Sequence, residues 1–238
     1  MLPEDFTDRL QIIHTRLAGA AARAGRRAEE ITLVAVTKGH PAEMVRAAYE
    51  AGLRHFGENR PTELLQKQAT LLLPDAYWHF IGHIQRRRAR ELVGKSHLVH
   101  SIDRLELAQE LSKRAVAGGA VVAGLLQVNS SGEESKGGWD ITLPEGSAHF
   151  LADIAPLLAL PNLEVRGLMT MAPYYEEAER TRPTFSALRA LRQTLREHFP
   201  AHSFEMLSMG MSNDFEVAIE EGATHVRIGT SLFGPPEI

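Results

Sequence analysis

The sequence contains no cysteine, which excludes disulfide bonds, thiolate catalysis and cysteine-ligated zinc. It also lacks any apolar run near the roughly 20 residues that a membrane-spanning helix requires. Residues 1–5 lack the basic start and apolar core of a secretory signal. Positive charge is not in excess, because 30 acidic residues outnumber 26 basic ones and the formal net charge is -4. We therefore expect a cytoplasmic protein with no nucleic-acid or membrane partner.

What the chain does contain is a repeating alternation of strand and helix patterns. Its 238 residues suit one α/β barrel, whose usual size is about 250 residues. An amphipathic helix is predicted over residues 3–25, and helical patterns then separate short apolar strands. The predicted strands span residues 31–36, 53–57, 77–82, 97–102, 121–128, 163–171, 204–209 and 224–230. The pattern predicts a single (β/α)8 TIM-type barrel domain over residues 1–238, with a doubly wound open sheet as the alternative.

Local signals add predictions about individual segments. Residues 85–93 are expected to form a basic helix, and residues 212–221 a short helix. Asp103 is expected to cap the helix that follows it, because Glu106 stands three residues later in capping-box spacing. Residues 129–139 are rich in glycine and serine and are predicted to form a loop.

Lys38 closes the first predicted strand and is the candidate reactive residue. The apolar run over residues 31–36 is long enough for a strand buried on both faces, as in parallel sheets. A lysine at the carboxyl end of such a strand lies where α/β proteins bind small molecules. If an apolar wall half-buries the ammonium, the free amine becomes available to attack a carbonyl. The alternative is a snorkelling lysine at a strand end.

Two segments near the end of the chain predict an anion site. Residues 208–214 run from a strand through Gly210 into a predicted helix, and helix N-termini bind phosphate through unpaired amides. Residues 227–231 end the last strand, where barrel enzymes often bind phosphate. Helix capping by Asn213, and close packing at Gly229, are the structural alternatives. A strand-end lysine together with a phosphate site suits a phosphorylated aldehyde.

The order of these motifs closely resembles that of the pyridoxal 5′-phosphate homeostasis proteins, over nearly the whole chain. The matching segments are residues 36–38, 56–59, 78–82, 101–103, 132–137, 166–169, 207–212 and 226–230. The resemblance implies a barrel like the N-terminal domain of alanine racemase, with pyridoxal 5′-phosphate (PLP) held as a Schiff base on Lys38. It also implies further cofactor-binding residues, namely Asn59, Met209, Ser212, Arg227, Gly229 and Thr230. Of these, Ser212, Gly229 and Thr230 would hold the phosphate, and Arg227 would approach the pyridine nitrogen.

The resemblance further implies a protein that binds and delivers PLP within the cell, without efficient turnover. A permanently charged Arg227 disfavours a protonated pyridine nitrogen and so weakens the ring as an electron sink. Racemases of this type use a second base from another domain, and we expect none after residue 238. Tyr174 and Tyr175 are expected to be packing or rim residues. We expect a monomer that contacts PLP-dependent apoenzymes transiently. A PLP-dependent amino-acid racemase and a cofactor-free phosphate-binding isomerase are the alternatives.

Three other patterns have weaker functional interpretations. His79 and His83 have the spacing of helical zinc ligands, but they lie at a predicted strand end, so no metal site is expected. Arg86 to Arg90 is expected to be a solvated helix face rather than a nucleic-acid site. Lys136 either receives PLP transiently or is a surface lysine, and the sequence leaves both open.

Overall fold

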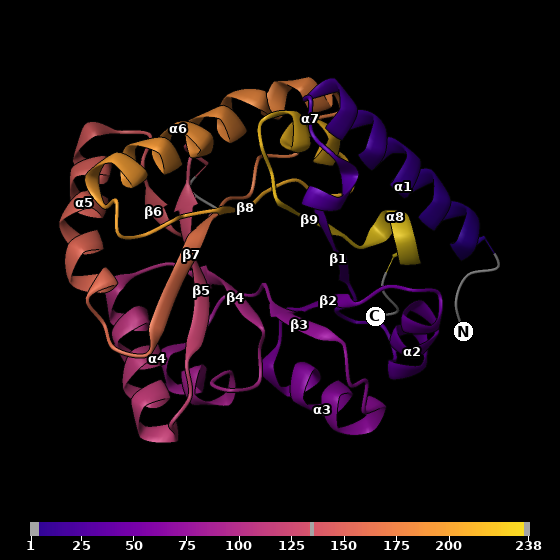
Figure 1. Ribbon diagram of the computed structural model, residues 1–238, viewed down its shortest axis with the longest axis horizontal. Helices are drawn as coiled ribbons and strands as arrows, with labels where there is room; N and C mark the ends of the chain where they lie inside the picture. Colours follow the sequence, from indigo (N-terminus) through magenta and orange to yellow (C-terminus); the bar gives the residue numbers. More distant parts are fainter. Residues whose placement is uncertain (1–4, 134–135, 236–238) are drawn as a thin grey trace.

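The computed structural model describes residues 5–133 and 136–235. Its strands form one closed ring, with helices around the outside (Figure 1). The strands of the ring are β1 Thr32–Val36, β2 His55–Glu58, β3 Tyr77–Phe80, β4 Leu98–Ile102, β5 Val122–Asn129, β7 Leu163–Met169, β8 Met206–Ser208 and β9 His225–Ile228. Every pairing is parallel, and the β4–β5 pairing closes the ring. The predicted barrel is therefore confirmed, and the open-sheet alternative is wrong.

The helices follow the strands in the order that the sequence predicts. The α-helices are α1 Phe6–Arg23, α2 Ala42–Glu50, α3 Pro61–Leu71, α4 Leu105–Gly118, α5 Pro144–Leu158, α6 Arg182–His198, α7 Phe215–Glu220 and α8 Thr230–Phe233. Short 3₁₀ helices are η1 Ala28–Glu30, η2 Arg86–Glu91 and η3 Ala178–Thr181. The apolar faces of the α-helices cover strands such as β5, in which every residue is buried. Residues 3–4 of the predicted first helix, and residues 134–135 of one matching motif, lie outside the described residues.

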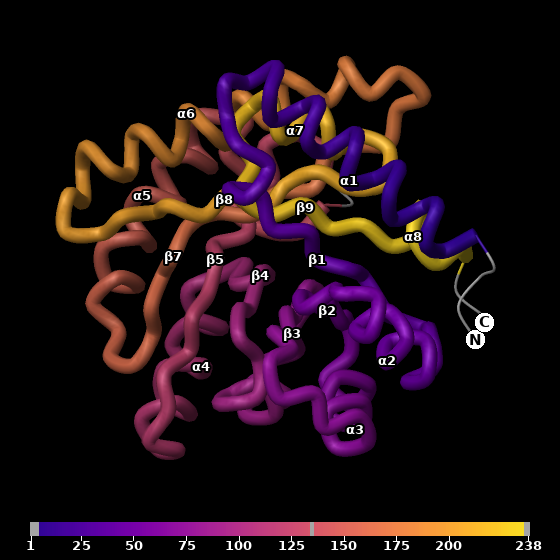
Figure 2. Tube along the Cα trace, turned by 45° about the vertical axis from the view of Figure 1, so that its right-hand side comes forward, coloured from indigo at the N-terminus to yellow at the C-terminus, as the bar shows by residue number. Residues whose placement is uncertain are grey.

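The extra N-terminal helix α1 lies against α7 and α8 on the outside of the barrel (Figure 2). Its buried face repeats every three or four residues, through Phe6, Leu10, Ile13 and Leu17, as an amphipathic helix requires. After α1, the Arg26 guanidinium donates to the carbonyls of Ile219 and Ala223, at 3.1 and 2.7 Å. The first helix is thus fixed to the segment that carries the last strands.

Two local helix predictions are wrong. Residues 86–91 form the 3₁₀ helix η2 rather than an α-helix, because Arg88 bonds to the carbonyl three residues earlier and pairs with Glu91 three residues later. Helix α4 begins at Leu105, and Asp103 does not cap it. The Asp103 carboxylate instead pairs with His83 and Arg104, so it is not available to the helix amides.

Two further segments differ from prediction. The loop of residues 129–139 ends in a short strand, β6 Trp139–Asp140, which pairs with β5. Helix α7 begins at Phe215 instead of Ser212, because residues 211–214 form a turn closed by the Met211 amide on the Asp214 carboxylate at 2.6 Å. Within the two described ranges, no helix has both the length and the apolar character to cross a bilayer.

We predict that Ile13→Ala lowers the free energy of unfolding by about 2–5 kcal/mol, because it leaves a cavity under α1. Ile13 is 1% exposed, whereas its neighbour Ile12 is 56% exposed. Ile12→Ala is the matched control and should change stability by about 0.5 kcal/mol or less. Denaturant unfolding measures both variants. Equal losses in the two would contradict the packing of α1 described here.

Candidate functional site

Barrel closure brings Lys38 and the end of β9 to one place. In parallel register, Val36 pairs with Gly57 of β2, so Lys38 and Asn59 reach the same level beyond the strands. On its other side β1 pairs with β9, and a Cβ on Gly229 would lie 3.2 Å from the carbonyl oxygen of Val36. The close-packing interpretation of Gly229 is thus supported, because a side chain there would separate the two strand ends.

The loops after β8 and β9 meet beside this point. The amide of Ser231 donates to the Ser212 hydroxyl at 3.4 Å. Ser212 is half-buried and Thr230 is exposed, so this part of the barrel end is accessible to solvent. Ser212, Gly229 and Thr230 therefore come together as the sequence predicts, whereas the Met209 side chain is fully buried in the main core.

The capping alternative for this loop is wrong. Asp214 occupies the N-cap position of α7, and no side chain caps the helix. Asn213 instead donates from its amide nitrogen to the Tyr175 carbonyl at 2.6 Å. Glu216, the other member of the expected capping box, pairs with Arg16 at 2.7 Å. The loop is therefore tied to the chain after β7 and to α1, and its shape does not depend on a helix cap.

Lys38 begins a turn immediately after β1, and its side chain is exposed. The expectation of a half-buried ammonium is wrong, because burial ends at Thr37 and the chain turns outward at Lys38 and Gly39. The amine is thus accessible from solvent at the carboxyl end of the barrel, the end at which the Ser212 and Thr230 hydroxyls also lie.

A buried network holds the backbone on both sides of Lys38. The Lys67 ammonium donates to the carbonyl of Thr37 at 2.8 Å, and the amide of Gly39 donates to a Glu63 carboxylate oxygen at 2.7 Å. Lys67 also pairs with Glu58 and with Glu63, at 2.7 Å each. Since buried, multiply bonded charges have little freedom to move, this network fixes the turn from which Lys38 projects.

Burial dominates the electrostatics of Glu58, whose side chain is fully buried. It raises the pKa of Glu58 to about 7, although the nearby Lys67 charge opposes the shift. Burial also acts to raise the pKa of Glu63, but hydrogen bonds from Lys67 and Gly39 outweigh it and leave that pKa below its usual value. The two carboxylates of one network therefore titrate in different pH ranges.

Arg227 lies inside the barrel on β9 and is 5% exposed. Its guanidinium donates to the Ser208 hydroxyl at 2.6 Å and to the Thr170 carbonyl at 3.0 Å. Burial lowers the pKa of Arg227 to about 10, which leaves the side chain charged at neutral pH. A fixed cation thus lies beneath the carboxyl ends of β7, β8 and β9.

Asn59 and Lys136 come from two other loops at this end. A Cβ on Gly82 would lie 2.2 Å from the Asn59 carbonyl oxygen, so only glycine lets the loop after β3 pack against half-buried Asn59. In the loop after β5, the Asn129 amide oxygen accepts from the amides of Ser131 and Gly132. The half-buried Lys136 pairs with Glu133 at 3.7 Å.

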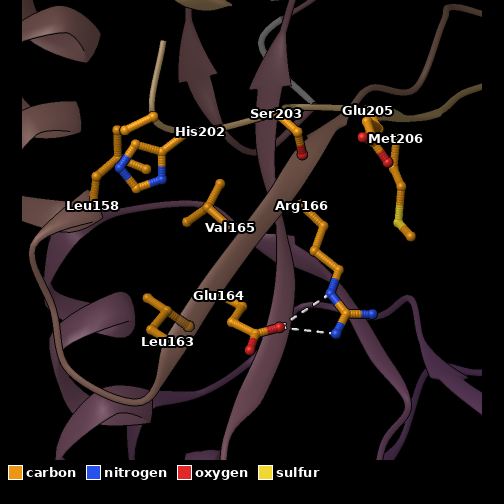
Figure 3. Close-up of a pocket in the computed structure, with 10 residues that line it drawn as sticks. Leu158, Leu163, Glu164, Val165, Arg166, His202, Ser203, Glu205 and Met206 are labelled. Atoms are coloured by element: carbon orange, nitrogen blue, oxygen red, sulfur yellow. Dashed lines mark hydrogen bonds and ion pairs between the residues drawn. The ribbon is translucent and has the colours of Figure 1, made fainter. Parts of the chain in front are cut away.

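A cavity of about 460 Å³ lies at the opposite end of the barrel (Figure 3). Its lining includes Leu163 and Met206, the first residues of β7 and β8, and an ion pair of Glu164 with Arg166 at 2.8 Å. None of the predicted cofactor-binding residues lines it. The predicted loop residues Lys38, Ser212 and Thr230 follow the carboxyl ends of β1, β8 and β9, the end at which barrel enzymes place their active sites.

Sequence reasoning missed a set of polar residues inside the barrel. His55, His79 and His100 lie on consecutive strands and are linked to Ser208 and then to Arg227. The zinc-like spacing of His79 and His83 does not reflect a contact, since His79 is buried in β3 and bonds to His100, whereas His83 is exposed and pairs with Asp103. The available signal was a histidine inside each of several predicted strands.

The fold and the strand-end site define a barrel of the alanine racemase type. The family model described as "Alanine racemase, N-terminal domain" matches residues 12–236. An alanine racemase from Clostridium difficile shares the fold, with a TM-score of 0.73 and 15% identity over 96% of this chain and 57% of the racemase.

Relatives of higher sequence identity identify the family more specifically. A "Pyridoxal phosphate homeostasis protein" of Aquifex aeolicus is 45% identical over 95% of this chain and 96% of its own length. PipY of Synechococcus elongatus, whose structure was solved without PLP, is 37% identical over 96% of this chain and 100% of its own, with a TM-score of 0.84. A second PipY structure, with PLP bound, gives 0.83. The chain belongs to the pyridoxal phosphate homeostasis protein family.

We predict that Glu58→Gln changes how stability depends on pH. The pKa of Glu58 is raised from 4.5 to about 7 in the folded protein, so its contribution to stability is full below pH 4.5 and is lost as pH rises through 7. Between those values the wild type should lose about 3 kcal/mol relative to Glu58→Gln. Denaturant unfolding across this pH range provides the measurement.

Glu63→Gln is the matched control for this experiment. Because the folded pKa of Glu63 is lowered, the wild type should gain stability relative to Glu63→Gln as pH rises from acid. The two differences should therefore have opposite signs. The same sign in both would contradict the assigned network.

Proposed function

We propose that this protein binds PLP through Lys38 and serves in intracellular PLP homeostasis and delivery. One observation carries the proposal: an accessible amine after β1 and two hydroxyls from the loops after β8 and β9 lie at the same end of the barrel, where β1 and β9 are paired. PipY, which was solved with PLP bound, has the same fold at 37% identity. PLP supplies an aldehyde that a primary amine attacks with loss of water.

The donor set fits this cofactor. Lys38 supplies the amine, while the hydroxyls of Ser212 and Thr230, with the backbone at Gly229, suit a phosphate dianion. Arg227 has guanidinium N–H groups beyond those donated to Ser208 and Thr170, and these would suit the pyridine nitrogen of PLP. Asn59 and Met209 complete the proposed pocket, the first from its rim and the second from the core.

The same residues support storage and delivery without efficient turnover. A cation at the ring nitrogen opposes its protonation and weakens the electron sink that amino-acid racemisation needs. Neither neighbouring tyrosine offers a buried catalytic base, since Tyr174 is 78% exposed and Tyr175 stacks against Arg180 at 4.3 Å. We further propose a cytoplasmic monomer that passes PLP to apoenzymes during transient contacts.

We predict that Lys38→Ala abolishes the absorption band of covalently bound PLP, because Lys38 supplies an exposed amine, whereas the neighbouring Lys67 ammonium is buried and paired with Glu58 and Glu63. Lys136→Ala is the matched control, since Lys136 projects from another loop at the same end and pairs with Glu133. Spectra of the two purified variants, recorded after addition of PLP, make the comparison. Loss of the band in Lys136→Ala but not in Lys38→Ala would contradict the assignment.

We predict that the PLP-loaded protein converts L-alanine to D-alanine no faster than free PLP does. The expected cause is the weakened electron sink beside Arg227. Chiral chromatography of timed samples measures the product. Rapid formation of D-alanine, lost in Lys38→Ala, would reject the delivery function in favour of a racemase.

A further inference from the structure

A line of polar side chains crosses the interior of the barrel below the proposed site. The Nδ1 atom of His55 lies 2.9 Å from Nε2 of His79, and Nδ1 of His79 lies 2.8 Å from Nε2 of His100. Nδ1 of His100 then lies 2.8 Å from the Ser208 hydroxyl, across the barrel from β4 to β8. We call His55, His79, His100 and Ser208 the histidine relay.

The relay joins two ends of the barrel. His55 is the first residue of β2 and is half-buried, with its ring stacked on the exposed Tyr77 at 4.7 Å. His79, His100 and Ser208 are fully buried. At the other end, the Ser208 hydroxyl accepts a hydrogen bond from the Arg227 guanidinium.

Arg227 determines the direction of every hydrogen bond in the relay. A guanidinium can only donate, so the Ser208 oxygen accepts from it. Among the residues that the structure describes, the Ser208 hydroxyl hydrogen then has one hydrogen-bond acceptor, Nδ1 of His100. If His100 donated instead, this buried hydroxyl hydrogen would be left without a partner, which is costly. His100 therefore carries its hydrogen on Nε2 and donates a hydrogen bond to Nδ1 of His79.

The same constraint repeats at each ring. His79 accepts at Nδ1, so it carries its hydrogen on Nε2 and donates to Nδ1 of His55. This order requires neutral rings, and burial lowers the pKa of His55 to about 4 and holds those of His79 and His100 well below the usual value. The Arg227 charge also lowers the pKa of His100, and the Arg166 charge lowers that of the neighbouring His97, which lies outside the relay.

His225 lies beside the relay and is not part of it. Its ring centroid is 6.0 Å from that of His79 and 6.1 Å from that of His100, and its Nδ1 is 2.9 Å from the Thr224 hydroxyl. Burial lowers the pKa of His225 to about 4 as well. His225 and Thr224 therefore offer an internal control, a buried histidine with a hydroxyl partner that has no hydrogen bond to Arg227 among the described residues.

We propose that the histidine relay is a one-directional hydrogen-bonded chain that positions the Arg227 guanidinium through the Ser208 hydroxyl. His79 and His100 are thus positioning residues, which act on Arg227 through Ser208. The inference rests on the proposed function only in assigning Arg227 to the PLP ring. The order of the hydrogen bonds itself belongs to the ligand-free protein.

The test is the tautomer of each ring in the ligand-free, full-length protein, from long-range ¹H–¹⁵N spectra at neutral pH. His55, His79 and His100 are all expected in the Nε2–H form, with an excess of about tenfold or more at the two buried rings. An Nδ1–H form or a charged ring at His79 or His100 would overturn the proposal. Because no PLP is present, failure here is separate from failure of PLP binding.

Two variants test whether the relay acts as a unit. Ser208→Ala removes one hydroxyl and should give mixed tautomers at His79, which Ser208 does not touch, and faster exchange of the Arg227 guanidinium protons. Thr224→Ala, the matched control, should leave His79 and Arg227 unchanged. His100→Asn keeps an acceptor near the Nδ1 position and should retain slow exchange at Arg227. An unchanged His79 in folded Ser208→Ala would overturn the proposal.

Discussion

Pairing of β4 with β5 is the constraint on which the rest of the structure depends. It closes the sheet, so that strands far apart in sequence end on a common face. Lys38 after β1, Ser212 after β8 and Thr230 after β9 lie at neighbouring strand ends because β1 pairs with β9 and β9 with β8, and closure places β4 across the barrel from β8. An open sheet with the same strands would leave the interior histidines on a solvent face and Ser208 without His100, its partner across the barrel.

Closure also creates an interior in which polar groups must be paired. Two networks meet this requirement in different ways. Around Lys67, opposite charges neutralise one another and hold the backbone beside Lys38. Around Arg227, the guanidinium donates to neutral acceptors, the Ser208 hydroxyl and the Thr170 carbonyl, and the Asp214 carboxylate favours its charged form without a direct ion pair in the described residues. The site thus combines the exposed amine of Lys38, on a turn held by hydrogen bonds, with the buried Arg227 cation, which is held by Ser208 and Thr170.

The sequence was sufficient for the barrel, because eight apolar segments alternate with helical patterns. It also brought together Ser212, Gly229 and Thr230. The sequence was insufficient to predict the hydrogen-bond or ion-pair partner of a side chain that has more than one possible partner. Asp103 has capping-box spacing but binds His83 and Arg104, and Asn213 binds the Tyr175 carbonyl. Such choices depend on residues brought close only by the fold.

The exposure of Lys38 and the histidine relay have the same explanation. Whether a strand-end lysine is covered depends on the loops around it, and those loops come from the whole ring of strands. The relay links β2, β3, β4 and β8, and sequence spacing within any one strand carries no sign of it. Local pattern therefore predicted the elements, while the chemistry inside them required their arrangement.

Borohydride reduction of the PLP-loaded protein, followed by peptide mass spectrometry, tests the central claim most directly. Reduction makes the bond between amine and cofactor permanent, so the modified lysine can be located. The account predicts one pyridoxyl group, on the peptide that contains Lys38. A label on Lys136 or on any other lysine, with Lys38 unmodified, would contradict it.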